Sequence, residues 1–257
     1  MKVRSEARDD LWIVTITRPE LRNCVDRETA EALAEAFRSF DENDDLRVAI
    51  LQGEGGTFCA GADLKAVSRG EPGEANRVRL TGDGPMGPTR MLLTKPVVAA
   101  VEGYAVAGGL ELAIWCDLRV AARDAVFGVY CRRWGVPLID GGTIRLPRLI
   151  GQSHAMDMIL TGRGVTSEEA LAMGLINRMV EPGEAFDAAL ELAASIAKFP
   201  QRCLRSDRHS ALTQWSASLE DALREETRLG LEVIRSGETQ QGAKLFAGGA
   251  GRHGAFD

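Results

Sequence analysis

Apolar strand-like runs alternate with amphipathic segments along much of the chain, and this alternation limits the possible folds more than any other feature. Residues 11–17 (Leu-Trp-Ile-Val-Thr-Ile-Thr) are rich in the β-branched and aromatic side chains that favour strands. From Asp26, apolar side chains recur at helical spacing to about Phe40, and residues 48–52 have the pattern of a second, buried strand. A strand, a helix and a strand in this order predict an α/β fold with largely parallel strands.

The same order returns further along the chain. Residues 96–101 have the pattern of a strand, and a helix is expected from Gly108 through Cys116. Short strands are expected at residues 118–122 and 126–129. Residues 68–88 are crowded with Gly, Pro, Arg and Glu and have no clear period. We expect this segment to be a mobile surface loop that borders a binding site.

The strand signal disappears in the last part of the chain. Thr166-Ser-Glu-Glu169 has the pattern of a helix capping box, and residues 184–199 predict a long amphipathic helix. Beyond Pro200 the sequence has the pattern of helices, followed by a Gly-rich tail. We therefore predict an α/β core over residues 1–195 and a helical C-terminal region over residues 196–257.

Composition places the chain among globular proteins and argues against several partners. Of its 257 residues, 45% are hydrophobic and 26% are charged, which are ordinary values for a folded domain. Lys and Arg total 31 against 37 Asp and Glu, and the net charge of −6 argues against a nucleic acid or an anionic membrane as the main partner. The sequence also lacks the apolar run of about 18 residues that a membrane span needs, and the pattern of a signal peptide.

The cysteines and histidines do not have the spacing of a metal site. The five cysteines are odd in number, widely separated and free of any Cys-x-x-Cys motif, and the three histidines are scattered. We therefore expect neither a zinc nor an iron–sulfur centre, and a reduced, cytoplasmic compartment. These residues are Cys24, Cys59, Cys116, Cys131, Cys203, His154, His209 and His253.

Two glycine-bearing turns present backbone amides in a way that suits an anion. Residues 58–64 (Phe-Cys-Ala-Gly-Ala-Asp-Leu) follow a buried strand and precede a helical segment, so that amides near Gly61 point out of a tight turn. Within residues 103–112, Gly108 and Gly109 start a helix, where the amides are unpaired and the helix dipole is positive. Either turn alone is more often only a tight turn. Together they predict an oxyanion hole.

The pair Cys59-Ala-Gly-Ala-Asp63 and Ala107-Gly-Gly-Leu-Glu111 resembles the enoyl-CoA hydratase/isomerase (crotonase) family. Residues 134–146, 160–162 and 170–176 are similar to further motifs of that family in order and spacing. The resemblance implies an α/β spiral of repeated ββα units and a helical C-terminal region that builds a homotrimer or a dimer of trimers. It also implies acyl-CoA thioester substrates whose enolate is stabilised by two backbone amides. Coenzyme A is then part of the substrate, and neither a separate cofactor nor a metal is expected.

The resemblance assigns roles to individual residues. The amides of Ala62 and Gly108 correspond to the oxyanion donors. Glu111 lies three residues after Gly108 on the same helical face, and it resembles the first of two family glutamates. The second family glutamate, the general acid/base in hydration, falls at Cys131. This chain therefore has a thiol where the family has a carboxyl group.

Asp140 offers a carboxylate in place of that glutamate. It is similar to the acidic position that dienoyl-CoA isomerases and aryl-CoA dehalogenases use as base or nucleophile, although an aspartate before Gly-Gly is also ordinary in a loop. Burial raises the pKa of a thiol further above neutral pH, whereas a carboxyl group in an apolar pocket reaches the operating pH. We therefore predict that Asp140, and not Cys131, is the second functional group.

Other side chains are predicted to contact the substrate. Lys65, just after the first turn, and Arg18, after the first strand, are expected to face the CoA phosphates. Arg252 is expected to do so from a neighbouring subunit, although all three are equally compatible with solvated surface charges. The expected walls of the acyl pocket are Tyr130, Cys131 and Trp134.

Three functions follow from these residues. The first is hydration or dehydration of a 2-enoyl-CoA through an enolate. The second is double-bond isomerisation of an enoyl- or dienoyl-CoA, which needs only one base and so tolerates Cys131. The third is a catalytically silent acyl-CoA-binding protein, which is favoured if Cys131 and Asp140 are both idle.

Overall fold

The computed structural model describes residues 1–70 and 73–251. Contacts divide the chain into two compact units, Met1–Ile196 and the part from Ala197 onward. Within the described residues, the first unit contains all the strands and the second contains helices.

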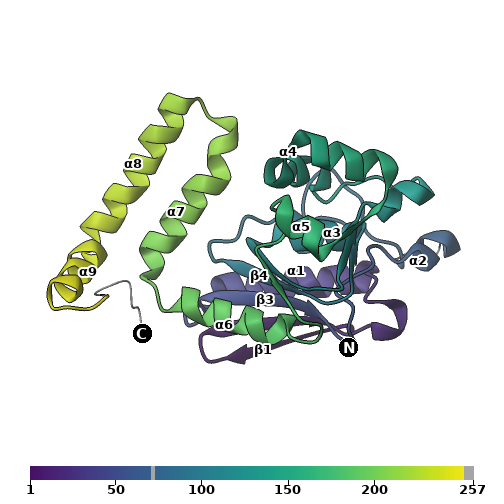
Figure 1. The fold of residues 1–257 in the computed structure, drawn as a ribbon, viewed down its shortest axis with the longest axis horizontal. Coiled ribbons are helices and arrows are strands. Elements are labelled where there is room, and N and C mark those ends of the chain that lie inside the picture. The colour runs from purple at the N-terminus through teal and green to yellow at the C-terminus, as the bar shows by residue number, and fades with distance from the viewer. Residues whose placement is uncertain (71–72, 252–257) are drawn as a thin grey trace. The chain divides into compact units, whose positions relative to one another are not determined.

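A six-stranded sheet forms the centre of the first unit (Figure 1). Its strands are β1 (Val3–Arg8), β2 (Leu11–Ile16), β3 (Val48–Gly53), β4 (Val97–Val101), β6 (Leu118–Ala122) and β9 (Arg178–Val180), in the order β1-β2-β3-β4-β6-β9. All neighbouring strands are parallel except β1 and β2, so the prediction of a largely parallel sheet is confirmed. Ile13, Ile50 and Val98 lie side by side across β2, β3 and β4 and are buried, as is typical of strands covered on both faces.

A second sheet has three strands, in the order β5-β7-β8. These are β5 (Tyr104–Val106), β7 (Val126–Gly128) and β8 (Gly164–Thr166). The chain passes from β4 to β5 and into helix α3 (Gly108–Trp115), and later from β6 to β7 and, through the short 3₁₀ helix η3 (Tyr130–Trp134), into α4 (Gly142–Thr161). Two strands followed by a helix therefore repeat along the core.

Helix α3 lies entirely inside the first unit. All eight of its residues are buried, because every one except Glu111 is apolar or glycine. Its last residue, Trp115, packs edge-on against Phe37 of α1 (Arg27–Glu42), with the ring centroids 4.9 Å apart. The buried Arg119 guanidinium donates to the carbonyl oxygen of Cys116 at 2.7 Å, just beyond the C-terminus of α3. A fully buried helix therefore carries Glu111.

Two helix starts predicted from the sequence are confirmed, and each has a capping side chain. The Asp26 carboxylate accepts a hydrogen bond from the Thr29 amide at 3.0 Å and caps α1. The Thr166 hydroxyl accepts one from the Glu169 amide at 3.3 Å and caps α5 (Ser167–Ala172). The remaining helical segments before residue 200 are α2 (Leu64–Arg69), α6 (Ala185–Ala197) and the 3₁₀ helices η1 (Pro19–Leu21) and η2 (Pro88–Arg90).

Some elements have no counterpart among the predicted ones. Helix α4 is hidden in the sequence because Pro147 and Gly151 interrupt its period, and the backbone kinks at Gly151, where φ is +76°. Strand β1 is hidden because all its side chains except Val3 are exposed. Strands β8 and β9 have three residues each, which is too short for a pattern to be recognised.

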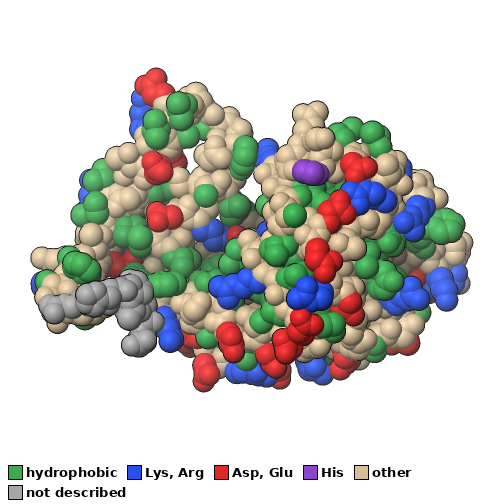
Figure 2. Space-filling view, in the orientation of Figure 1, with side chains coloured by type: hydrophobic (Ala, Val, Ile, Leu, Met, Phe, Trp, Pro, Cys, Tyr) green, Lys and Arg blue, Asp and Glu red, His purple; other side chains and the backbone are tan. Residues whose placement is uncertain are grey.

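The second unit consists of α7 (Gln201–Thr213), the 3₁₀ helix η4 (Gln214–Ser216), α8 (Leu219–Arg235) and α9 (Glu238–Ala247). Helix α8 is strongly amphipathic, yet Val233 is its only buried residue. Its exposed large apolar side chains are Leu219, Leu223, Leu231 and Ile234. Figure 2 shows apolar side chains, in green, at the surface of these helices. In the described part of the chain, no helix is both long and apolar enough to cross a membrane.

Candidate active site

A cavity of about 810 Å³ opens in the first unit. Its walls come from α2, the start of α3, η3 and the connecting residues 75–86 and 135–140, so part of the loop predicted at residues 68–88 does border a cavity. Most of the lining is apolar and includes Leu64, Val67, Val78, Met86, Val106, Val136 and Ile139. The charged residues at the lining are Arg22, Glu111, Arg133 and Asp140. A mostly apolar cavity with a few convergent charged groups is typical of a small-molecule site.

The two glycine-bearing turns contact each other at this cavity. A Cβ atom added to Gly61 would lie 3.0 Å from the amide nitrogen of Gly108, and one added to Gly109 would lie 1.9 Å from the carbonyl oxygen of Cys59. Larger residues are therefore excluded at positions 61 and 109. This close approach brings Ala62 and Gly108, from segments far apart in sequence, to the same cavity wall.

Both amides are available to a ligand. Across residues 1–70 and 73–251, neither Ala62 nor Gly108 donates its amide hydrogen to another group of the chain. Gly108 is the first residue of α3, so its amide belongs to the positive end of the helix. The preceding Ala107 has φ +55° and ψ −125°, a conformation that a residue with a Cβ rarely adopts. The strained residue Ala107 therefore directly precedes the helix that begins at Gly108.

Glu111 lies inside the protein and reaches the same cavity. Its side chain is 2% exposed, and Oε1 accepts hydrogen bonds from the amides of Asp140 at 2.9 Å and Gly142 at 2.8 Å. Within the described residues, Oε2 accepts none. Burial, and then the nearby carboxylate of Asp140, raise the pKa of Glu111 to about 7 against the opposing effect of the two amides. Both protonation states of Glu111 are therefore populated near neutral pH.

Asp140 is 3% exposed and lies two residues before α4. Its Oδ1 accepts a hydrogen bond from the Met86 amide at 2.9 Å and a short one from the Thr89 hydroxyl. Burial raises the pKa of Asp140, although these two donors and the nearby arginines, Arg90 and Arg145, favour the ionised form. The structure therefore brings Glu111 and Asp140 together, as predicted from the sequence.

Sequence reasoning missed the groups that hold Asp140. Arg145, on α4, donates from Nη1 to the carbonyl oxygen of Asp140 at 3.0 Å and from Nη2 to that of Thr89 at 2.7 Å. Thr89 itself is buried in η2. No spacing links positions 86 and 89 to position 140, so only the fold reveals these contacts.

Cys131 also lines the cavity, in η3. Burial, and then the Glu111 carboxyl group, raise the pKa of its thiol, which is thus protonated at neutral pH. A protonated thiol is a poor base. The preference for Asp140 over Cys131 therefore remains a prediction, now with a physical basis.

Tyr130 and Trp134 occupy different parts of the cavity. The guanidinium carbon of Arg133 lies 3.7 Å from the centroid of the Tyr130 ring, which makes a cation–π contact at the wall. Trp134 is 72% exposed, so it lies at the open rim. An apolar side chain held at the rim is suited to contact a ligand that extends out of the cavity.

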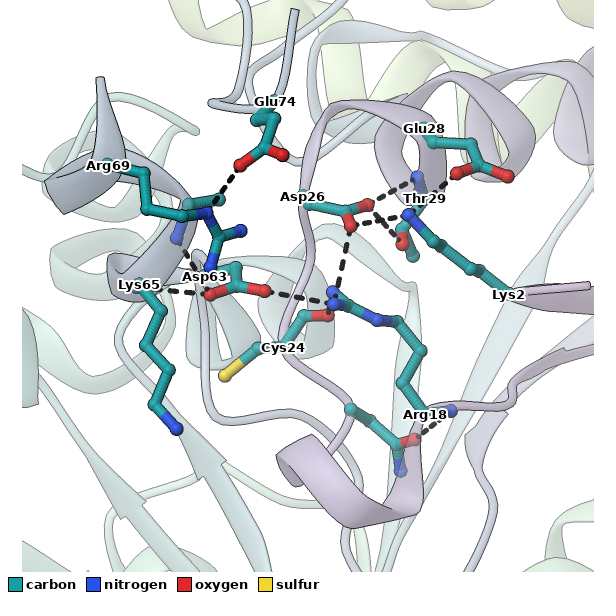
Figure 3. Close-up of polar contacts among 12 residues, drawn as sticks. Lys2, Arg18, Cys24, Asp26, Glu28, Thr29, Asp63, Lys65, Arg69 and Glu74 are labelled. Carbon is teal, nitrogen blue, oxygen red and sulfur yellow. Dashed lines mark hydrogen bonds and ion pairs between the residues drawn. The ribbon is translucent and has the colours of Figure 1, made fainter. Parts of the chain in front are cut away.

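The expectation that Arg18 faces the CoA phosphates is wrong. Arg18 is only 7% exposed, and its guanidinium lies among Asp63, Asp26 and the carbonyl oxygen of Cys24 (Figure 3). A charge surrounded in this way is satisfied within the protein and is not presented to a ligand.

The other two expected phosphate ligands stay predictions. Lys65 lies in the first turn of α2, and its exposed side chain extends away from the Arg18 guanidinium in Figure 3. Arg252 lies outside the described residues. Among the described residues there is also no group of three or more His, Cys, Asp or Glu side chains that would hold a metal ion.

Comparisons with known proteins agree with this geometry. The family described as enoyl-CoA hydratase/isomerase matches residues 6–249. An enoyl-CoA hydratase of Mycobacterium tuberculosis, EchA19, is 39% identical over 253 residues, which cover 94% of this chain and 92% of that protein. A carnitinyl-CoA dehydratase of Salmonella arizonae is 38% identical over 226 residues, which cover 87% of this chain and 82% of that protein.

The fold leads to the same family. The crystal structure of the enoyl-CoA hydratase EchA1 from Mycobacterium marinum matches this chain with a TM-score of 0.89 at 39% identity, covering 96% of this chain and 95% of that one. The crotonase fold inferred from sequence motifs is therefore confirmed. The chain belongs to the enoyl-CoA hydratase/isomerase family.

Proposed function

We propose that this protein adds water to 2-enoyl-CoA thioesters and removes it from 3-hydroxyacyl-CoA thioesters, using Glu111 and Asp140 as a pair. One observation carries the proposal. The buried carboxyl groups of Glu111 and Asp140 line the same cavity as Ala62 and Gly108, whose backbone amides donate to no other group of the described chain. The backbone amide of Asp140 also donates to Glu111 Oε1. The named relatives, a hydratase and a dehydratase of CoA thioesters, support this reaction class.

The two carboxyl groups differ in the protonation state that they favour. Burial raises the pKa of Asp140, but the two hydrogen bonds to its Oδ1 and the nearby Arg90 and Arg145 oppose that rise and favour the ionised form. Burial beside that negative charge favours the protonated form of Glu111, whose pKa is about 7. When two carboxyl groups share one proton and differ in pKa, the ionised one can act as a base and the protonated one as an acid in the same reaction.

In the hydration direction, the oxygen of water bonds to the β-carbon of the enoyl thioester while ionised Asp140 takes a proton from that water. The electron pair of the C=C bond moves toward the thioester oxygen, and the resulting enolate oxygen accepts hydrogen bonds from the amides of Ala62 and Gly108. Protonated Glu111 then gives its proton to the α-carbon as the carbonyl group re-forms. Exchange with solvent returns a proton from Asp140 to Glu111, and dehydration follows the same steps in reverse.

Coenzyme A enters this proposal as part of the substrate, with no separate cofactor. The acyl group occupies the apolar cavity beside Met86 and Val136, which offers few polar groups other than the reacting ones. Lys65, at the start of α2, is our candidate for contact with the CoA phosphates, and Arg252 is a second candidate from a neighbouring subunit.

We also propose that the helical second unit builds a homotrimer or a dimer of trimers. The exposed apolar face of α8, with Leu219 and Leu223, provides an area that a single chain leaves in contact with water. Light scattering at micromolar concentration is expected to give a mass of three or six chains. A monomeric mass contradicts this part of the proposal.

The experiment that tests the function is turnover of a panel of enoyl-, dienoyl- and 3-hydroxyacyl-CoA esters, run beside a binding titration with a non-reactive CoA ester. The proposal predicts interconversion of 2-enoyl-CoA and 3-hydroxyacyl-CoA. Movement of a double bond without uptake of water identifies an isomerase, for which a single carboxylate suffices. Tight binding without turnover of any ester identifies a silent acyl-CoA-binding protein.

A further inference from the structure

Arg18 is the centre of a buried ion-pair cluster that joins the N-terminal ends of two helices (Figure 3). Its Nη2 lies 2.9 Å from Oδ2 of Asp63 and 3.3 Å from Oδ2 of Asp26, and its Nη1 donates to the carbonyl oxygen of Cys24 at 2.5 Å. Lys2 lies at the outer edge of the cluster, 2.6 Å from Asp26. The Arg18 cluster therefore consists of Arg18, Asp26 and Asp63, and Lys2 contacts it from outside through Asp26.

Asp63 connects this cluster to the first glycine-bearing turn. It directly follows Ala62, and its Oδ1 caps α2 by accepting hydrogen bonds from the amides of Lys65 and Ala66, both at 3.1 Å. The other oxygen, Oδ2, faces Arg18. The Asp63 side chain is thus held at both oxygens, one by a helix and one by a guanidinium.

The backbone on both sides of Ala62 is held by the same segment. The amide of Val25 donates to the carbonyl oxygen of Gly61 at 2.8 Å, and the amide of Asp63 donates to the carbonyl oxygen of Val25 at 2.9 Å. Arg18 fixes this segment too, through the carbonyl oxygen of Cys24. The Arg18 guanidinium therefore supports the Ala62 amide in two ways, through the Asp63 side chain and through the backbone at Cys24 and Val25.

The chemistry of the cluster explains why an arginine occupies its centre. Asp26 and Asp63 are both buried, and two buried carboxylates need a shared positive charge. Burial disfavours the Asp63 carboxylate, but the Ala66 amide and the Arg18 guanidinium hold the pKa of Asp63 below its usual range. The planar fork of Arg18 reaches three acceptors at once, which the single ammonium of a lysine does not reproduce.

We infer that Arg18 is a positioning residue of this enzyme, which acts through Asp63 to aim the Ala62 amide at the thioester oxygen. The inference rests on the proposed function, since it takes the Ala62 amide as one oxyanion donor. It assigns Arg18 to stabilisation of the enolate, with no contact to the substrate. The same support also sets the start of α2, from which Leu64 and Val67 face the cavity.

The test compares three variants of the full chain with the wild type. Arg18→Lys keeps the charge and removes the fork, and Asp63→Asn keeps an oxygen that can cap α2 while it weakens the pairing with Arg18. Lys2→Met is the matched control, because Lys2 pairs with Asp26 in the same cluster and does not contact Asp63. Asp63→Asn also serves if Arg18→Lys fails to fold.

Two readouts separate positioning from general support of the fold. The first is a comparison of how much each variant changes kcat and how much it changes KM for hydration of a 2-enoyl-CoA. The second is the red shift of a bound dialkylaminocinnamoyl-CoA, whose absorption moves to longer wavelength as its thioester carbonyl is polarised by hydrogen bonds. The red shift requires no turnover, and circular dichroism identifies the variants that are folded.

We expect the folded Arg18→Lys or Asp63→Asn variant to lose about tenfold to a hundredfold in kcat, to change KM less than threefold, and to lose part of the red shift. Lys2→Met is expected to retain both wild-type values. A wild-type red shift and kcat in a folded Arg18 or Asp63 variant overturn this inference and leave the proposed function intact. No red shift and no hydration in the wild type overturn both.

Discussion

The two carboxyl groups of the proposed site are held in different ways. Glu111 is carried by α3, a helix whose eight residues are all buried, and it lies one turn after the glycine that starts the helix. Asp140 lies in the irregular segment before α4, and its carboxylate is held by Met86 and Thr89, which come from a distant part of the chain. Both carboxylates accept hydrogen bonds from residues distant in sequence, but the backbone of Glu111 is placed by its own helix. The comparison teaches that an irregular segment, such as the one at Asp140, also needs partners such as Arg145 to hold its backbone.

The largest effect on activity is expected for Glu111, the proton donor of the proposed mechanism. Glu111→Gln is expected to keep acyl-CoA binding and to lose about 10²- to 10⁴-fold in hydration rate, since a glutamine accepts the two amide hydrogen bonds but does not donate a proton to carbon. Glu102→Gln is the matched control, because Glu102 also accepts hydrogen bonds from two backbone amides, those of Gly183 and Ala185. Steady-state kinetics and a binding titration measure both variants, and wild-type turnover in Glu111→Gln excludes the role of Glu111.

The second effect distinguishes Asp140 from the thiol that shares its cavity. Asp140→Asn is expected to lower the hydration rate by at least about a hundredfold, because it removes the base. Cys131→Ala is expected to retain a substantial fraction of activity, since burial keeps the thiol protonated. Both are measured on whichever CoA ester is turned over fastest. Loss of activity in Cys131→Ala with retention in Asp140→Asn reverses the assignment.

A smaller effect is expected from the partner that holds Asp140. Thr89→Val keeps the shape of a buried side chain and removes the hydroxyl that donates to Asp140 Oδ1. We expect about a tenfold loss of activity and a shift of the acid limb of the pH–rate profile to higher pH, because the Asp140 carboxylate loses a donor and its pKa rises further. Thr94→Val is the control, since the exposed Thr94 donates in the same way to Asp41, which lies outside the cavity lining. If the acid limb of the pH–rate profile does not shift in Thr89→Val, then ionisation of Asp140 does not determine that limb.

The smallest effect concerns stability and its dependence on pH. Folding raises the pKa of Glu111 to about 7, so its contribution to the free energy of unfolding is fully present below the pKa of the unfolded chain and is lost as pH rises through about 7. Glu111→Gln does not have to bury a charge, and we expect it to exceed the wild type in stability by about 1–3 kcal/mol at pH 8. Near pH 4.5 the advantage should vanish. Urea unfolding at one protein concentration measures the difference, and an advantage that is equal at both pH values contradicts the raised pKa.

The same comparison shows how far the sequence predicts this site. The turns at Gly61 and Gly108 and the helix that carries Glu111 follow local patterns, so residues near in sequence suffice to predict them. The expectation that Arg18 faces the CoA phosphates is wrong because its partner Asp63 is far away in sequence, and burial of the pair exists only in the folded chain. Thr89, whose neighbourhood has no period, could not be found for the same reason.

The central claim is that the protein forms an enolate between two carboxyl groups, with water added at one carbon and a proton at the next. The most direct test is the mass of the product formed from a 2-enoyl-CoA in water enriched in both deuterium and oxygen-18. The account predicts one oxygen-18 at the β-carbon and one deuterium at the α-carbon, with both lost in Glu111→Gln and Asp140→Asn. A product that contains deuterium without oxygen-18, or neither isotope, contradicts it.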